Sequence, residues 1–170
     1  GNLHIGGSAV FGGIAILSMG TNRFDGYVRS LEIGNKSSGY AGWARADMGE
    51  VREGFLDVSG SVKICLGTYA QAAVRIATNP ASANFRITIG TPTVRANFQL
   101  ADGDRYRNNL LPDSPSFVAG GVFEAFVTNF TIANNTGMES TPHVRFDLSR
   151  VVAGILDISE NMIVATGYTG

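Results

Sequence analysis

The sequence predicts a mainly β protein with one domain, either a β-sandwich or a segment of a barrel, with one short flanking helix. Residues 58–66 alternate between apolar and small or polar side chains, as a strand with one buried face does. Residues 84–89 and 93–100 alternate in the same way. Turn-forming residues separate these runs, and the chain has 22 glycines. These observations together favour short strands joined by turns, within a single domain over residues 1–170.

The composition is low in charge and nearly neutral. Charged residues make up 16% of the chain and hydrophobic residues 44%, with a net charge of −1. The balance provides no general basic field for nucleic acid or anionic lipid. A surface with so few charged side chains suits a protein that is covered by copies of itself. An ordinary β domain with small-residue turns has the same composition, so this alternative remains open. No apolar window reaches the length of about 18 residues typical of a membrane span, and 9–19 lacks a signal-peptide pattern.

The N-terminal third predicts an edge element, a strand and a long loop. Residues 1–20 are apolar and interrupted by glycines, which suits an N-terminal arm or an extra strand. Residues 27–33 alternate as a strand. Residues 34–54 lose all periodicity, yet they contain large aromatic and arginine side chains of the kind that interfaces favour. We expect this loop to contact another subunit; the alternative is a small cluster folded back on its own sheet. The expected self-assembly residues are Tyr40, Trp43, Arg45, Met48 and Arg52.

The middle of the chain predicts one helix followed by a hairpin. Tyr69, Ala72, Ala73 and Ile76 have helical spacing within 68–78, and Thr68 is a suitable N-cap. The alternating runs 84–89 and 93–100 then form the hairpin around a Gly-Thr-Pro turn. Beyond the polar loop 101–116, residues 117–133 predict one long strand or two, and 144–148 and 163–166 predict shorter ones. No period of 20–50 residues is evident in the sequence, so no repeat architecture is predicted.

Motifs for catalysis or metal binding are weak or missing. Cys65 is the only cysteine and cannot form an internal disulfide. A dyad of Cys65 with His143 has no supporting motif, and His4 and His143 lack the spacing of a zinc site. Asn35, Asn129 and Asn134 match the glycosylation motif, where chance predicts about two matches, so they carry no functional prediction. We therefore expect no enzyme activity, no catalytic residue, no cofactor and no metal.

Residues 27–100 resemble the tail tube proteins of long-tailed bacteriophages. The resemblance depends on Gly54, on the run 58–62 and on the helix predicted at 69–76. It implies a β-sandwich with a flanking helix that completes its sheet by oligomerisation into rings. These rings stack into a hollow tube that DNA passes through, and the loop 34–54 would reach the neighbouring ring. The strand forming the tube wall would contain Val58, Ser59, Ser61, Val62, Lys63 and Ile64. The apolar start at 6–19 departs from the family's pattern.

The main hypothesis is accordingly a structural virion protein that is made in the host cytoplasm and self-assembles. Its expected partners are other copies of itself, other virion proteins and DNA in transient passage, without a membrane. Two alternatives remain open at this point. One is another virion shell component, such as a capsid decoration or major capsid protein. The other is a binding module of the lectin, adhesin or pilin kind, whose loops hold a ligand.

Overall fold

The computed structural model describes residues 1–5, 14–20, 22–34, 43–66, 71–101, 116–133 and 144–164. These residues form a mainly β structure with a single short 3-10 helix. In chain order the elements are β1 (Asn2–Ile5), β2 (Ile14–Ser18), β3 (Arg23–Ile33), β4 (Trp43–Met48), β5 (Glu53–Ile64), β6 (Gln71–Ile76), η1 (Pro80–Ser82), β7 (Arg86–Ile89), β8 (Ala96–Leu100), β9 (Ser116–Ile132) and β10 (Arg145–Val164). The predicted β class is confirmed.

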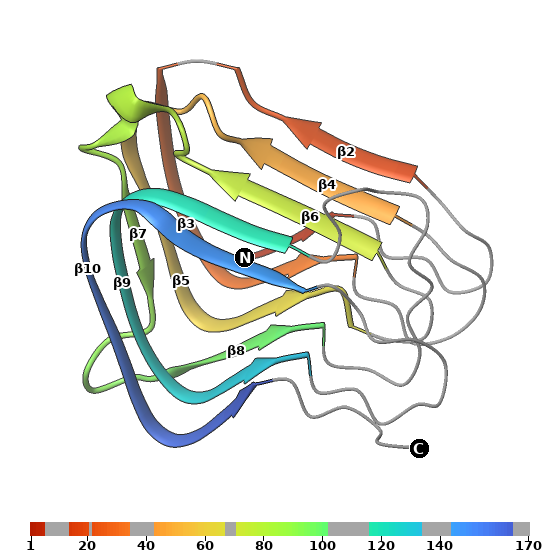
Figure 1. Cartoon of the computed structure of the whole chain (residues 1–170), viewed down its shortest axis with the longest axis vertical. Coiled ribbons are helices and arrows are strands. Elements are labelled where there is room, and N and C mark those ends of the chain that lie inside the picture. The colour runs from red at the N-terminus through yellow and green to blue at the C-terminus, as the bar shows by residue number, and fades with distance from the viewer. Residues whose placement is uncertain are drawn as a thin grey trace.

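The described strands pair only in parallel, and they stack as successive coils of a solenoid-like arrangement (Figure 1). The first coil contains β2 and β3, the second contains β4 and β5, and the third contains β6, η1, β7 and β8. The fourth coil is β9 and the fifth is β10, while β1 precedes the first coil. The long strand β9 shows the layout best, because it pairs along its length with β6, then β7, then β8.

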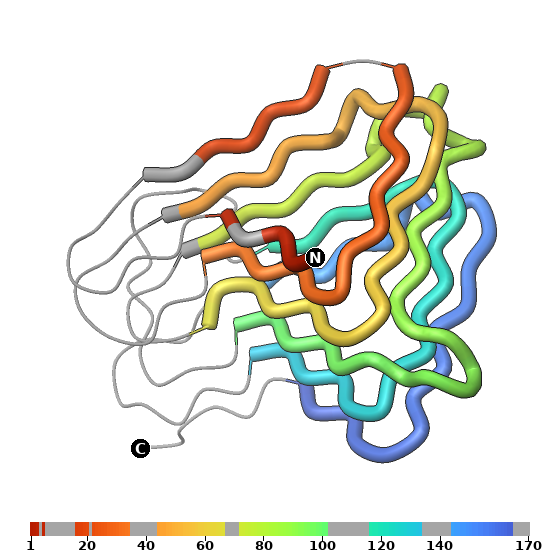
Figure 2. The backbone as a smooth tube through the Cα atoms, turned by 180° about the vertical axis from the view of Figure 1, so that it is seen from behind, coloured from red at the N-terminus to blue at the C-terminus, as the bar shows by residue number. Residues whose placement is uncertain are grey.

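Each coil therefore contributes to three faces, which Figure 2 shows from behind as three rows of adjacent strands. The first face contains β2, β4, β6 and the beginnings of β9 and β10. The second contains the first parts of β3 and β5, then β7 and the middle of β9 and β10. The third contains β1, the ends of β3 and β5, then β8 and the ends of β9 and β10.

The core lies inside the coils, and phenylalanine rings fill its later part. Phe98, Phe117, Phe123 and Phe130 are fully buried, and Phe146 of the last coil packs against all four. Phe98 stacks on Phe130 with ring centroids 5.1 Å apart, and Phe117 stacks on Phe146 at 5.6 Å. Each stacked pair joins one coil to another. Aromatic burial of this kind gives large apolar area together with a specific ring geometry, and it stabilises the stacking of the coils.

The strands of the third face end at a corner that recurs from coil to coil. Gly34, Cys65, Ala101 and Ala133 directly follow β3, β5, β8 and β9, and their φ angles are 62°, 58°, 57° and 56°. Each donates its backbone N–H to a carbonyl of the neighbouring coil, as Cys65 does to Ile33 at 2.9 Å. A left-handed conformation is unfavourable for residues other than glycine, so the stacked coils must hold it in place.

This recurrence corrects the prediction that the sequence has no repeat. Corresponding residues of successive coils are separated by about 30 residues, which lies within the range of solenoid periods. The period is irregular in the third coil, because extra residues separate β7 from β8 and make this coil longer than the others. Within them Thr91 donates its N–H to the carbonyl of Val94 at 2.8 Å and closes a turn. The inserted turn shifts every later position.

Three finer predictions about the elements are also corrected. The helix predicted at 68–78 is wrong, because Gln71–Ile76 forms the strand β6. Ala72, Val74 and Ile76 are buried there with the alternation of a strand. The apolar Ala73 between them added a residue at helical spacing, which favoured the helix in the sequence. The predicted hairpin is wrong, since β7 and β8 both lie parallel to β5 and β9 instead of pairing with each other. The loop predicted at 34–54 contains β4. The predicted sandwich or barrel is not confirmed.

Candidate functional site

The residues predicted for self-assembly lie in different surroundings. Tyr40 lies outside the described residues, and Trp43 is the first residue of β4. Arg45 is half-buried on the outer side of β4, whereas Met48 is fully buried inside the coil. Arg52 is exposed just before β5, and its N–H donates to the carbonyl of Asn22 at 3.1 Å. The structure thus places Met48 in the core and leaves Arg45 and Arg52 toward solvent. Their role in assembly stays a prediction.

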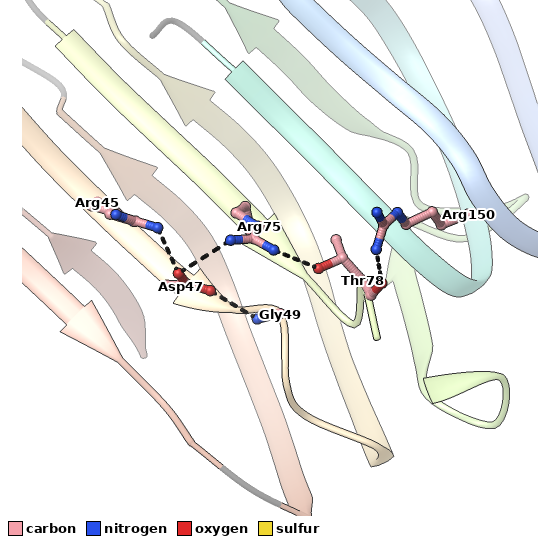
Figure 3. Close-up of polar contacts among 6 residues, drawn as sticks. All are labelled: Arg45, Asp47, Gly49, Arg75, Thr78 and Arg150. Carbon is pink, nitrogen blue, oxygen red and sulfur yellow. Dashed lines mark hydrogen bonds and ion pairs between the residues drawn. The ribbon is translucent and has the colours of Figure 1, made fainter. Parts of the chain in front are cut away.

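Arg45 belongs to a series of polar contacts that crosses the coils at one corner (Figure 3). Its Nη2 donates to Asp47 Oδ2 at 2.8 Å, and Arg75 Nη1 lies 3.7 Å from the same oxygen. Arg75 Nη2 also donates to Thr78 Oγ1 at 3.4 Å, and Arg150 donates to the Thr78 carbonyl. These contacts link β4, β6 and β10. Because the ion pairs are partly exposed, each contributes little stability alone, and we interpret the series as structural.

The alternation predicted for the wall strand is present in β5. Its inward side chains are buried, and its outward side chains are half-buried or exposed. The inward group contains Val58, Val62 and Ile64, and the outward group contains Ser59, Ser61 and Lys63. Ser61 and Lys63 line a groove on the outside of the coil. A role of β5 as a tube wall stays a prediction.

This groove, which we call the polar groove, runs along the outer side of the third face. Its main part has a volume of about 550 Å³ and crosses β5, β8, β9 and β10. Ser61 also lines a second hollow of about 280 Å³, which extends across β1 and β3. The lining residues of the main part are Ser61, Lys63, Asn97, Gln99, Asn129, Thr131, Asn161 and Ile163. Those of the second hollow are Asn2, Arg29, Ser30, Glu32, Gly60 and Ser61. The groove therefore runs across the strands, along the direction in which coils are added.

A ladder of three asparagines forms the floor of the groove. Asn97, Asn129 and Asn161 are register partners on β8, β9 and β10. Asn129 Nδ2 donates to Asn97 Oδ1 at 3.1 Å, and Asn161 Nδ2 donates to Asn129 Oδ1 at 2.8 Å. No sequence motif predicted this group, although the asparagines recur at a spacing of about 30 residues. Such a recurrence is visible only after the coil repeat has been identified.

Bulges position the ladder at the bend between the second and third faces. The register of β8 with β9 shifts between Ala96 and Asn97, and that of β10 with β9 shifts between Ile158 and Asn161. The register of β3 with β5 shifts at the same bend, just before Ser30. A bulge bends a strand and changes the direction of the side chains that follow. Each coil consequently turns a polar side chain outward at the same place.

The charges in the polar groove are few and largely balanced. Lys63 Nζ lies 3.7 Å from Glu32 Oε1, so the main part has a cation with a carboxylate beside it. Arg29 is the other basic residue that lines the groove in the described part of the chain. All other described lining residues are uncharged. The groove therefore presents mainly amide and hydroxyl groups.

Two carboxylates of the last coil accept hydrogen bonds, one from another coil and one from neighbouring residues of β10. Asp157 on β10 accepts a hydrogen bond from Arg95 Nη2 at 2.8 Å, and this contact lowers the pKa of Asp157. The same contact raises the pKa of Arg95. Asp147 accepts from the hydroxyl and N–H of Ser149 and from Arg145, which together hold its pKa well below 3.8. Both carboxylates therefore favour the charged form in the folded protein.

The described residues contain no arrangement that suggests catalysis. Cys65 is buried at the end of β5, and burial raises the pKa of its thiol, which disfavours the reactive thiolate. His143 lies outside the described residues. Among the residues that the structure describes, no three His, Cys, Asp or Glu side chains gather as a metal site would require. In the same part of the chain, no helix is long and apolar enough to cross a membrane.

Comparison with known proteins gives no match: no family model, curated protein or solved structure aligns with this chain.

Proposed function

We propose that the chain is a structural protein that acts by self-assembly, without catalysis. The observation that carries this proposal is the open last coil. Phe130 and Ile132 of β9 are buried, but their register partners on β10, Met162 and Val164, are 61% and 52% exposed. Among the described strands β10 pairs only with β9, so its outer edge has no strand partner there. An open edge beside exposed apolar side chains favours the addition of another strand.

A second copy of the chain is the occupant that we propose for this edge. Pairing there would supply hydrogen-bond partners for the backbone of β10 and remove its inward side chains from water. In this way the sheet would be completed by oligomerisation. The low content of charged side chains, 16%, agrees with a surface that is partly covered in the assembled state.

The more specific form of the proposal is a virion protein whose rings stack into a hollow tail tube for DNA. Its support is the sequence resemblance at Gly54 and over 58–62, since the helix that the resemblance included at 69–76 is the strand β6. The low charge, which would let DNA slide without sticking, is the second support. A capsid decoration or major capsid protein is the alternative within the same class. In both cases the protein acts with copies of itself and with other virion proteins, and it needs no cofactor.

Light scattering and electron microscopy of the purified chain test the proposal. We expect the mass to rise with concentration and polymers to be visible, with tubes favouring the tail tube and closed shells the capsid alternative. Met162→Glu, which adds a charge to the open end of the core, should reduce the mass to that of a single chain. Val94→Glu is the matched control, because Val94 is 62% exposed in the turn between β7 and β8. A single chain at all concentrations, or equal polymers from Met162→Glu, would refute the role of this edge.

A further inference from the structure

We propose that the polar groove binds a neutral oligosaccharide or polysaccharide, extended along the direction in which the coils stack. This inference goes beyond self-assembly, because the groove is complete within one copy of the chain.

The first support is the chemistry of the lining. Asn97, Asn129 and Asn161 each provide an amide, and Ser61 and Thr131 provide hydroxyls. Amides and hydroxyls both donate and accept hydrogen bonds, as the hydroxyl groups of a sugar do. Ligands that can use such groups are uncharged and rich in hydroxyls.

The second support is the repetition of these groups. Neighbouring strands are about 4.8 Å apart, and the groove crosses the strands. Asn97, Asn129 and Asn161 thus offer the same amide at regular intervals along the groove. Regular spacing of identical groups suits a polymer with a repeating unit better than a compact small molecule.

The third support is the hydrogen-bonding capacity that the ladder leaves unused. An asparagine amide has two N–H donors and an oxygen with two lone pairs. In the ladder, Asn129 uses one donor toward Asn97 and one acceptor position toward Asn161. One donor and one acceptor position remain for a ligand. The ladder also fixes the amide orientation in advance, which lowers the entropic cost of binding.

Two other kinds of ligand fit the groove less well. A polyanion needs a row of cations, but the described lining has only Lys63, which lies beside Glu32, and Arg29 at the far part. An extended peptide would need an open strand edge for main-chain pairing. The strands beneath the groove are already paired on both sides from β3 to β9.

Affinity electrophoresis of the whole chain in native gels tests the proposal. The probes are three neutral polysaccharides, namely a dextran, a mannan and a galactan, with dextran sulfate as the polyanionic probe. We expect at least one neutral probe to retard the protein. Asn129→Ala should weaken this retardation about five-fold, since it removes one ligand hydrogen bond and the centre of the ladder. The matched control is Asn84→Ala, because Asn84 is exposed and does not line the groove.

Each outcome decides the proposal. Retardation by a neutral probe that Asn129→Ala weakens and Asn84→Ala leaves unchanged supports it. Unchanged mobility in all neutral gels, retardation by dextran sulfate alone, or equal retardation of Asn129→Ala and the parent chain overturns it. Circular dichroism verifies that each variant is folded. If Asn129→Ala does not fold, Asn97→Ala replaces it under the same criteria, because Asn97 is an exposed end of the ladder.

Discussion

Replacing Phe98 with alanine tests whether the phenylalanine cluster holds the later coils together. Phe98 is fully buried, and its ring lies 5.1 Å from that of Phe130, 5.4 Å from Phe117 and 5.5 Å from Phe146. Truncation of a buried phenylalanine to alanine lowers the free energy of unfolding by about 3–5 kcal/mol. Because three aromatic contacts are lost with the ring, we expect a value near the middle of that range, about 4 kcal/mol. This loss is a large part of the stability of an ordinary domain.

Urea denaturation followed by circular dichroism measures the effect. Phe55→Ala is the control: Phe55 is half-buried, and its ring lies 4.6 Å from that of Tyr27. This substitution should lower the free energy of unfolding by about 1 kcal/mol, since less apolar area is lost together with one ring–ring contact and the contact of Arg86 with the ring face. Hydrogen exchange on Phe98→Ala should show the largest loss of protection in β8 to β10, because the ring of Phe98 on β8 contacts rings of both β9 and β10. A change below about 1 kcal/mol for Phe98→Ala, or equal effects of the two variants, would refute this account of the core.

Three further predictions concern pH, a corner and the thiol. The pKa of Asp157 is lowered from 3.8 by the hydrogen bond from Arg95, so its stabilising effect is present above pH 3.8 and lost as the pH falls further. Between pH 5 and about 2 the melting temperature of Asp157→Asn should therefore fall less than that of the parent chain, and an equal fall would contradict this. Gly121→Ala should lower the free energy of unfolding, measured in urea, by more than about 2 kcal/mol, because φ is +69° and the new Cβ would lie 2.3 Å from the carbonyl oxygen of Phe85. Gly20→Ala is the control and should leave the stability unchanged, because no atom lies within 4 Å of a Cβ added there. Cys65 should react with a thiol reagent only after unfolding, and rapid reaction in the native state would show that it is accessible.

The sequence was sufficient to predict strands but not their partners. The alternation in β5 and in β8 follows from a buried face, and both strands overlap the runs predicted at 58–66 and 93–100. Alternation with a period of two does not indicate whether the neighbouring strand runs parallel or antiparallel, so β7 and β8 looked like a hairpin. The helix prediction failed at β6 because two apolar residues, Ala72 and Ala73, are adjacent in the sequence. With Ile76, Ala73 fits the spacing of a helix, whereas Ala72 fits the alternation of the strand that the structure has.

The candidate site was harder to predict than the fold class. Aromatic and arginine residues led to the prediction of a self-assembly loop at 34–54. In the structure, however, Met48 is in the core and Arg45 contacts Asp47. The polar groove depends on residues of six strands, from Asn2 to Ile163, and no local motif connects them. These residues occupy equivalent positions only when the sequence of each coil is aligned with that of the next. The extra residues of the turn between β7 and β8 make this alignment difficult to find from sequence.

The polar groove and the open edge meet on one strand, which links the two proposals. Asn161, the last rung of the ladder, lies on β10 beside Met162, and a copy that pairs with β10 would lengthen the groove. A polysaccharide long enough to cross the junction would then bind the assembled form more tightly and, by linkage, promote assembly. Light scattering should therefore show a rise in mass with a long neutral polysaccharide but not with a short oligosaccharide of the same sugar. Met162→Glu should still be retarded in the gel but show no such rise. An equal rise for Met162→Glu would mean that the polymer joins copies through their grooves alone, without pairing at β10.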